Sequence, residues 1–477
     1  MLDGYVDTGL TWDVHPDLVL LENAQRREIV CLALPKASAA QLQALSKLGA
    51  FCGYRYGQAA ALLYSQDSGF AGFDALRDRL EAFKLQAGLS GPFALPASAR
   101  GCLLKAQLAL ETGRQYEPGN ALYSMNEWGE VALVRAAELA LAGQGFDAAD
   151  FCDASLWQMA RTDEEKDTQY VRSLETYLRC GMDMKRAAAE LGVHRNTLAY
   201  RMERVQALFD LDFRDMNRCF ELLFSSWLVS CMVERVPALT DMPFDAAQAQ
   251  VALWQHMDRA KGGENAGGFA CMLLGASIGG LADSGRTALI SRMRQCAPEG
   301  TAFAFDEDVL FAAAAPEQME AFSHQAQQLC KGLGCPVVFT QVFPASRMIQ
   351  QARLCRMALR AGSGACMHTR DLYSALFFMA VERGASLAPY LCEDVIRVMD
   401  DDAQKGTALS RSLYAYLLNF QDMKRAAQQL GMHRNTMEYH MRKIDALIGK
   451  VEDEAHRFMM MCTYKMLALP ESGGTIW

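Results

Sequence analysis

The chain contains an internal repeat. Residues 183–202 read DMKRAAAELGVHRNTLAYRM and residues 422–441 read DMKRAAQQLGMHRNTMEYHM, with fourteen of the twenty positions identical. The offset is 239 residues, since 433 − 194 = 239, and the short matches RSL and YL upstream keep the same offset. We infer that the 477-residue chain is a tandem duplication with a repeat unit of about half its length.

The two halves also share an order of expected elements. Each begins with an apolar strand, at 29–34 and at 269–274, followed by a helix and a hairpin-like pair. A further helix, another extended piece, a helix near a proline and a long helical run then lead to the repeated motif. This pattern predicts an α+β fold of two repeats, each a sheet-containing α/β domain followed by an all-α module.

Prolines mark the expected join between the halves, within residues 237–243. The predicted domains are an α/β domain at 1–145, a helical module at 146–236, a second α/β domain at 237–385 and a second helical module at 386–477.

Helical spacing explains the repeated motif. Met184, Ala187, Ala188 and Leu191 fall at i, i+3, i+4 and i+7, which predicts a short amphipathic helix. Gly192 is expected to end it, because glycine adopts the left-handed conformation of a tight turn without strain. A second helix should begin near residue 194. The small alanines would let the two helices cross closely, which is typical of a helix-turn-helix.

The second helix of each copy is expected to be the recognition helix. Its predicted buried stripe contains Leu198, Met202, Val205 and Phe209 in the first copy, and Met437, Met441, Ile444 and Ile448 in the second. Hydroxyl, amide and guanidinium groups on the opposite face suit phosphates and base edges. The predicted DNA-binding residues are His194, Arg195, Asn196, Thr197, Tyr200, Arg201 and Arg204, and His433, Arg434, Asn435, Thr436, Glu438, Tyr439, His440, Arg442 and Lys443.

The overall charge of −9 argues weakly against a nucleic-acid partner, but the motifs have the opposite sign. Residues 183–204 hold five Lys or Arg and three Asp or Glu, and residues 422–443 hold five and two. Each motif is therefore locally basic. The alternative, a pair of amphipathic helices with solvated charges, is disfavoured because both copies keep HRNT and the outward tyrosine.

Each motif resembles a known family. HRNTLAYRMERVQAL and HRNTMEYHMRKIDAL are similar to the C-terminal helix-turn-helix of PucR/CdaR-type transcription regulators of purine and sugar-diacid use. The resemblance implies a closing helix after each motif, which residues 215–233 and 454–467 fit. It also implies double-stranded DNA as partner and a possible small-molecule effector. That family usually carries one such module, so the two here could form a pseudo-dimer within one chain, or a homodimer of whole chains.

The same family often places a degenerate GGDEF-type domain before this module. Residues 55–63, RYGQAAALL, resemble the RYGGDEFxxLL hairpin of diguanylate cyclases. Cyclase chemistry needs carboxylates to hold Mg²⁺ and a glycine beside the phosphates, and here Gln58, Ala59 and Ala60 replace them. In the second half, FDEDVL at 305–310 has acids but no glycine pair, and is interpreted as a solvated turn. We therefore expect no catalysis, and no catalytic residues, in either half.

Other features predict little chemistry. The fifteen cysteines are scattered without a CxxC pair, which indicates reduced, mostly buried thiols. The histidines outside the motifs have no ligand spacing, so no metal site and no cofactor are expected. The most apolar stretch, 222–233, is too short to span a membrane. The N-terminus has no signal-peptide pattern, so we expect a cytoplasmic protein.

Three functions compete. The leading hypothesis is a sequence-specific DNA-binding transcription regulator with non-catalytic α/β regulatory domains. The second is a nucleotide or second-messenger sensor, because lost acids remove turnover but not binding. The third is an interaction protein whose helical modules have drifted into dimerisation units. Steep loss of DNA affinity with salt would separate the first from the third.

Overall fold

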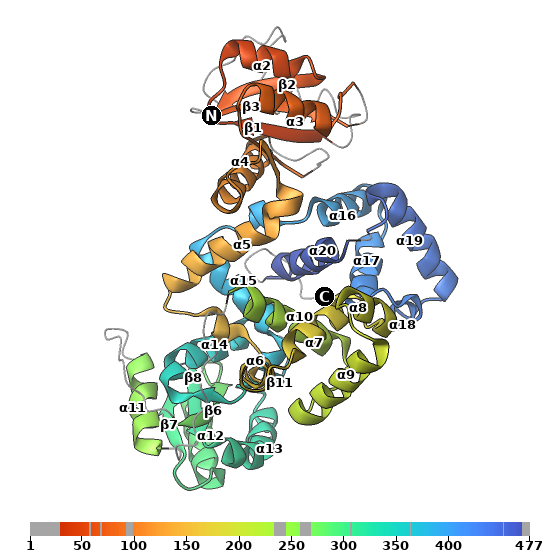
Figure 1. Ribbon diagram of the computed structural model, residues 1–477. Coiled ribbons are helices and arrows are strands. Elements are labelled where there is room, and N and C mark those ends of the chain that lie inside the picture. The colour runs from red at the N-terminus through yellow and green to blue at the C-terminus, as the bar shows by residue number, and fades with distance from the viewer. Residues whose placement is uncertain are drawn as a thin grey trace. The chain divides into compact units, whose positions relative to one another are not determined.

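The computed structural model describes residues 29–56, 59–66, 69–91, 99–232, 245–257, 269–305, 308–362, 364–451 and 453–469 (Figure 1). The expected join at 237–243 lies outside these residues. No helix in the described part of the chain is both long and apolar enough to cross a bilayer.

The N-terminal α/β domain is built on one mixed sheet. Its strands lie in the order β2-β3-β1-β4-β5, and only the β4–β5 pair is parallel. Both faces of the central strand are buried, which explains its unbroken apolar sequence, IVCLAL. The strands are β1 (Ile29–Leu34), β2 (Ala50–Tyr56), β3 (Ala59–Ser65), β4 (Ala87–Leu89) and β5 (Leu122–Ser124).

Helices cover both faces of this sheet. α2 (Ala39–Ser46) and α3 (Phe73–Ala82) pack on one face, and α4 (Ala99–Tyr116) packs on the other. The approach of α4 depends on Gly88 in β4, because a Cβ at that position would lie 1.8 Å from the carbonyl oxygen of Ala106. The sheet is therefore enclosed on both sides.

The second α/β domain repeats this topology. Its strands lie in the order β11-β9-β6-β8-β7, with β10 added beside β6, and again only one pair, β9–β11, is parallel. Element for element this is the order of the first sheet, so the predicted two-repeat α+β architecture is confirmed. The strands are β6 (Ala270–Ser277), β7 (Ala302–Phe305), β8 (Val309–Ala314), β9 (Val337–Phe339), β10 (Phe343–Pro344) and β11 (Cys366–His368).

The helices of the second domain follow the same plan. α12 (Asp283–Cys296) and α13 (Pro316–Gly332) cover one face through a continuous apolar cluster. α14 (Met348–Ala361) lies against β6, and α11 (Ala246–Met257) packs beside α14 on β7 and β8. The expected helix near Pro344 is thus α14, which begins four residues later, after the short 3-10 helix η2 (Ala345–Arg347).

The two segments compared with cyclase hairpins do form hairpins. Residues 55–63 span β2 and β3, where Ala59 pairs with Tyr56 and is buried. Gly57 and Gln58 lie outside the described residues, as do Asp306 and Glu307 between β7 and β8.

Each half ends in a helical module. α5 (Met125–Ala142) and α15 (Tyr373–Gly384) lead out of the sheet domains into modules of five α-helices preceded by a 3-10 turn. The first module contains η1 (Ala148–Phe151), α6 (Ala154–Lys166), α7 (Tyr170–Arg179), α8 (Met184–Glu190), α9 (Arg195–Phe209) and α10 (Met216–Cys231). The second contains η4 (Ala388–Tyr390), α16 (Glu393–Lys405), α17 (Leu409–Leu418), α18 (Met423–Gln429), α19 (Arg434–Ile448) and α20 (Glu454–Leu467).

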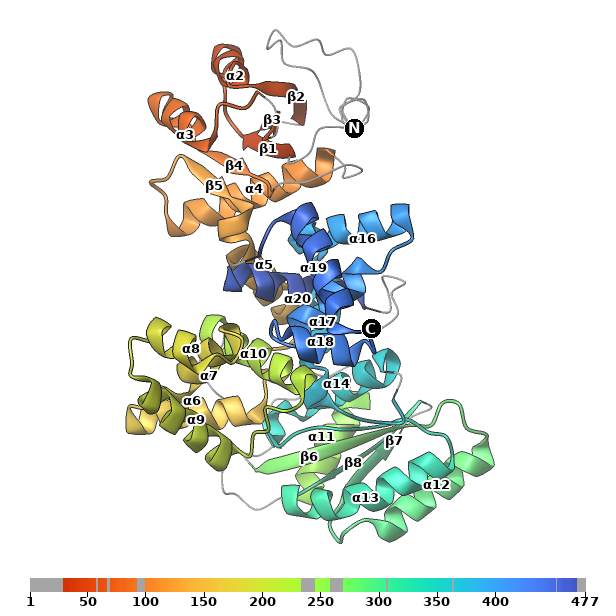
Figure 2. The ribbon, with the colours of Figure 1, turned by 90° about the vertical axis from the view of Figure 1, so that its right-hand side faces the viewer.

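The chain divides into two compact units, and this division crosses the repeat. One unit joins the N-terminal sheet domain, up to Ala137, to Ala385–Leu417 and Met423–Tyr464 of the second helical module. The other joins the first helical module to the second sheet domain in Glu138–Gly384, and it also includes Leu418–Asp422 and a segment that begins at Lys465. Each sheet domain is thus grouped with the helical module of the other half (Figure 2).

The cysteines are free thiols, as expected. Eleven of the fifteen are buried, and only Cys231 and Cys296 are exposed. Most of them therefore serve as small apolar core residues.

Candidate nucleic-acid interface

The first repeated motif folds as helix, turn and helix. Asp183 caps α8 by accepting hydrogen bonds from the backbone N–H groups of Lys185 (2.8 Å) and Arg186 (3.1 Å). These bonds, with that from Arg186 the larger effect, lower the pKa of the Asp183 carboxyl below its ordinary value. Gly192 follows α8 with φ +66°, and the amide of Val193 donates to the carbonyl of Ala188 at 3.0 Å. The predicted glycine turn is confirmed.

The predicted apolar stripes hold the two helices together. Ala187 and Ala188 of α8 are buried, and the side chains of Leu198, Met202 and Val205 on α9 are at most 3% exposed. In the second module Ala426, Ala427, Met437, Met441 and Ile444 are buried in the same register. Both stripes are confirmed along most of their length; their last members, Phe209 and Ile448, are half-buried.

A histidine caps each recognition helix. His194 Nδ1 accepts a hydrogen bond from the backbone N–H of Asn196 at 3.2 Å, and His433 does the same for Asn435 at 3.2 Å. Because Nδ1 is occupied as an acceptor, Nε2 is the ring atom that remains to donate outward. The sequence suggested only a contact role for these histidines, so their capping role was missed.

Most of the predicted DNA-binding side chains are exposed on one face of α9 or α19. Tyr200 and Tyr439 are 60% and 49% exposed, although a side chain as large as tyrosine is usually more deeply buried. The other exposed members are His194, Arg195, Asn196, Thr197 and Arg204, and His433, Arg434, Asn435, Thr436, Arg442 and Lys443.

Two predicted contact residues turn toward the helix that comes before the repeated motif, α7 in the first module and α17 in the second. Arg201 is half-buried, and its Nη1 donates to Gln169 Oε1 and to Ser173 Oγ, both at 3.2 Å. His440 occupies the equivalent position in the second copy, where its Nδ1 lies 2.7 Å from Ser412 Oγ. The repeated RSL segment places these serines at equivalent positions. In the sequence this segment indicated the repeat but not the contact with the recognition helix.

The recognition helices differ in how their first arginine is held. Arg434 Nε lies 2.8 Å from Glu438 Oε1, an ion pair within α19. Arg195 of α9 has Ala199 at the matching position, and among the described residues it has no ion pair or hydrogen bond through its side chain. Lys443 Nζ lies 4.8 Å from the centre of the Tyr439 ring, a cation–π contact. On α19, therefore, some of the exposed side chains are engaged with one another within the helix.

Comparison with known proteins identifies these modules. Residues 170–226 and 409–465 each match the PucR C-terminal helix-turn-helix domain. The chain carries two PucR domains. The matches run from α7 into α10 and from α17 into α20, so each PucR domain includes its recognition helix and most of its closing helix. The predicted closing helices are confirmed.

Other comparisons add little to the two PucR domains. A crystal structure titled as a regulator of polyketide synthase expression from Bifidobacterium adolescentis aligns over 47% of this chain and 94% of its own, at 13% identity and a TM-score of 0.22. So low a TM-score supports no inference about fold or function. No curated protein matches the chain.

Proposed function

We propose that the chain is a transcription regulator that binds double-stranded DNA in a sequence-specific manner through α9 and α19. The observation that carries this is the repeated exposed face, in which both PucR domains present HRNT and a tyrosine above a buried apolar stripe. A packing role alone would not require amide, hydroxyl, guanidinium and phenol groups to stand in solvent in both copies.

The proposed contacts follow from exposure. At the start of α9 and α19 the outward histidine Nε2 can donate to a phosphate, while arginine and asparagine side chains can read guanine and adenine edges. We assign direct contacts to the exposed side chains named above, and to Glu438. Arg201 and His440 are assigned a positioning role, because their side chains hold the recognition helix against α7 and α17.

The sheet domains are proposed to be regulatory and non-catalytic, within the domain boundaries 1–145 and 237–385. Ala59 and Ala60 are 5% and 3% exposed, and a buried methyl group offers neither a metal ligand nor space for one. We therefore expect no cyclic dinucleotide when purified protein is incubated with GTP and Mg²⁺, followed by chromatography of the products. Product formation above a no-protein blank would refute this assignment.

Fragments selected from the host genome by the purified protein provide the direct test of DNA binding. Affinity for a selected fragment should fall steeply with salt, because each neutralised phosphate releases counterions. Salt-independent binding, or no selection of any sequence, would refute the proposal. The oligomeric form on DNA, one chain as a pseudo-dimer or a homodimer of chains, is read from the mass of the complex.

Single arginine substitutions test the interface. Arg195→Ala should cost about 1–3 kcal/mol of affinity if the guanidinium reads a base with two hydrogen bonds. Arg434→Ala should cost less, because Arg434 must first leave Glu438. Equal losses would contradict the pairing argument, and unchanged affinity in both variants and in the double variant would mean that the face is misassigned.

Glu438 should make the preferred site asymmetric. A glutamate can accept a hydrogen bond from a cytosine amino group, whereas Ala199 at the matching position cannot. We expect an imperfect palindrome, and we expect Glu438→Ala to make the two half-sites more alike. Footprinting of wild type and Glu438→Ala on the same fragments measures this. A perfectly symmetric site preferred by both proteins would rule it out.

A further inference from the structure

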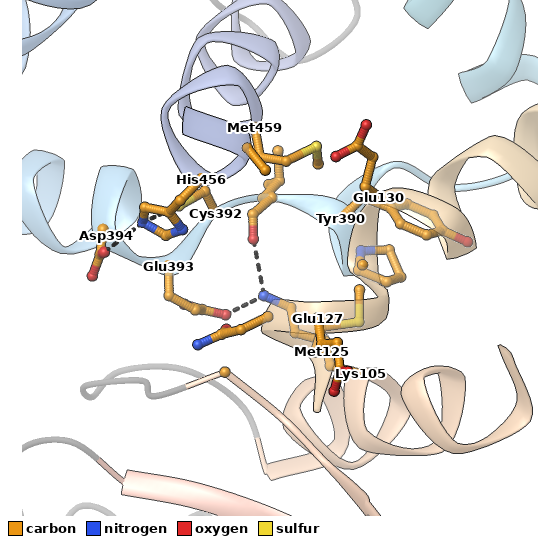
Figure 3. A pocket seen from close by; sticks show the side chains of 16 residues that line it. Lys105, Met125, Glu127, Glu130, Tyr390, Cys392, Glu393, Asp394, His456 and Met459 are labelled. Atoms are coloured by element: carbon orange, nitrogen blue, oxygen red, sulfur yellow. Dashed lines mark hydrogen bonds and ion pairs between the residues drawn. The ribbon is translucent and has the colours of Figure 1, made fainter. Parts of the chain in front are cut away.

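Three side chains with metal-ligand chemistry converge in the second helical module (Figure 3). Cys392 precedes α16, Asp394 lies in its first turn, and His456 lies in the first turn of α20. His456 Nε2 is 2.9 Å from Asp394 Oδ2 and 3.8 Å from Cys392 Sγ, and one ligand atom from each residue lies within 4.8 Å of the other two.

These separations match a tetrahedral zinc site. Zinc binds thiolate at about 2.3 Å and imidazole or carboxylate at about 2.0–2.2 Å, so neighbouring ligand atoms around it are roughly 3.3–3.6 Å apart. The observed 2.9 and 3.8 Å bracket that range, and small side-chain rotations would equalise them. A thiolate, an imidazole and a carboxylate together favour zinc over magnesium or calcium, which prefer oxygen ligands alone.

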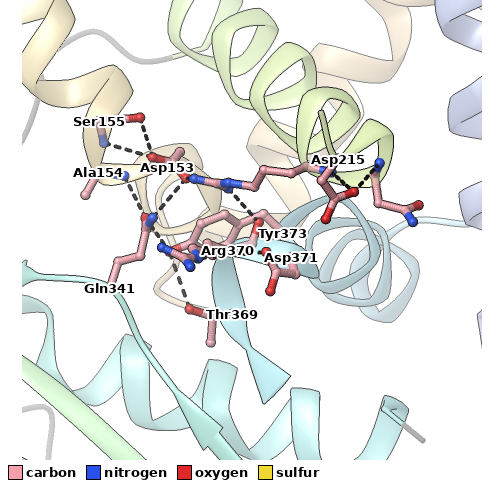
Figure 4. A network of polar contacts seen from close by, with 11 residues as sticks. Asp153, Ala154, Ser155, Asp215, Gln341, Thr369, Arg370, Asp371 and Tyr373 are labelled. Carbon is pink, nitrogen blue, oxygen red and sulfur yellow. Dashed lines mark hydrogen bonds and ion pairs between the residues drawn. The ribbon is translucent and has the colours of Figure 1, made fainter. Parts of the chain in front are cut away.

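The first module has a cation of its own at the equivalent place. Asp153 corresponds to Cys392: its backbone N–H donates to Ser225 Oγ at 3.1 Å, as that of Cys392 donates to Thr463 Oγ1 at 2.8 Å. The guanidinium of Arg218 pairs with Asp153 there (Figure 4).

His456 stands where Arg218 stands, since both follow the capping aspartate of the closing helix by three residues. The second module has thus exchanged a permanent cation for a set of ligands.

The cluster lies on the wall of a pocket of about 150 Å³ within one compact unit. Lys105 of α4 lies on another part of the wall, paired with Glu393 and donating to the carbonyl of Leu391 at 3.2 Å. Because all three ligand residues also line the pocket, a metal bound to them would keep a coordination position open to a small molecule or water.

We propose that Cys392, Asp394 and His456 form a zinc-binding site whose fourth position opens into this pocket. The sequence predicted no metal site because Cys392 and His456 are 64 residues apart and only the fold brings them together. The proposal is independent of DNA binding, since the three residues lie outside the recognition helices.

Metal binding by the full-length protein provides the test. Metal-free protein with Cys231→Ser and Cys296→Ser, which removes the exposed thiols, is titrated with Zn²⁺ against a chromophoric chelator, and separately with Co²⁺. We expect one zinc ion per chain and a near-ultraviolet thiolate-to-cobalt absorption band. Cys392→Ser should abolish the band, and Asp394→Asn and His456→Gln should weaken zinc binding at least 10–100-fold, the loss typical of weakening a metal's supporting residues.

Matched variants test whether any loss of zinc binding comes from the cluster itself rather than from removing a thiol or an imidazole elsewhere, or from a loss of stability. Cys366→Ser and His324→Gln alter a thiol and an imidazole outside the cluster and should bind zinc as wild type does. His456→Arg copies the first module and should keep the thermal unfolding temperature of the metal-free protein while binding no zinc. Retention of the cobalt band in Cys392→Ser, or no zinc bound at micromolar concentration, would overturn the proposal.

Discussion

Reversing two charges on one recognition helix should lower DNA affinity by about 10²–10⁴-fold, because the lost contacts also end the joint binding of the two modules. Two tethered modules bind DNA with an effective concentration that multiplies the affinity of each, and disabling one removes that gain. Arg195→Glu with Arg204→Glu does this for α9, and Arg434→Glu with Arg442→Glu does it for α19. All four side chains are exposed, so the fold should tolerate the changes.

The matched control carries the same change of charge elsewhere. Arg292→Glu with Lys331→Glu also changes the net charge by −4, from −9 to −13, but on exposed positions of α12 and α13. Its affinity should fall only modestly, through long-range repulsion that salt screens. Titrations at two salt concentrations separate the cases. If disabling either module alone leaves the affinity at the control level, the two modules do not engage one DNA molecule together.

Arg218→Met should destabilise the unit formed by the first helical module and the second sheet domain by about 3–5 kcal/mol, because it leaves a buried carboxylate without its cation. The side chain of Asp153 is 1% exposed. Without Arg218 it would keep neutral donors, chiefly the backbone N–H of Ser155 and the amide of Gln341, each at 2.9 Å (Figure 4). Hydrogen exchange of α6 and α10, followed by mass spectrometry, reports the loss locally.

Arg214, which lies just before the start of α10, provides the control. It pairs with Asp212 at 2.7 Å, yet its side chain is 91% exposed. Arg214→Met should therefore leave exchange unchanged, because water replaces a surface partner. Equal protection of α6 in Arg218→Met and wild type would show that the ion pair at Asp153 contributes nothing net. Reduced protection in both variants would point instead to a general effect on α10.

Local patterns predicted local structure well. The stripe through Leu198 and Val205 and the turn at Gly192 follow from helical spacing and glycine conformation, which depend on residues only a few positions apart. The duplication strengthened both predictions, because each copy constrained the reading of the other. The matching strand orders of the two sheets were predictable for the same reason.

Long-range arrangements were not predictable in this way. Nothing in the spacing of Arg201 indicates that its guanidinium turns toward Ser173. An arginine on the flank of a helix can equally well contact solvent, DNA or a neighbouring helix. The meeting of Cys392 and His456, and the crossed grouping of sheet domains with helical modules, depend on tertiary contacts that leave no periodic trace in the sequence.

The crossed grouping sets the order in which the chain can complete its folding during synthesis. The N-terminal sheet domain leaves the ribosome first, but the helices grouped with it extend to Tyr464. Between Ala137 and Tyr464 lie 464 − 137 = 327 residues of further translation, or roughly 15–65 s at bacterial and eukaryotic elongation rates. The second sheet domain, by contrast, finds its helical partner already made. The N-terminal sheet domain is therefore made before the second but waits longer for its helical module, and it must avoid aggregation during that time.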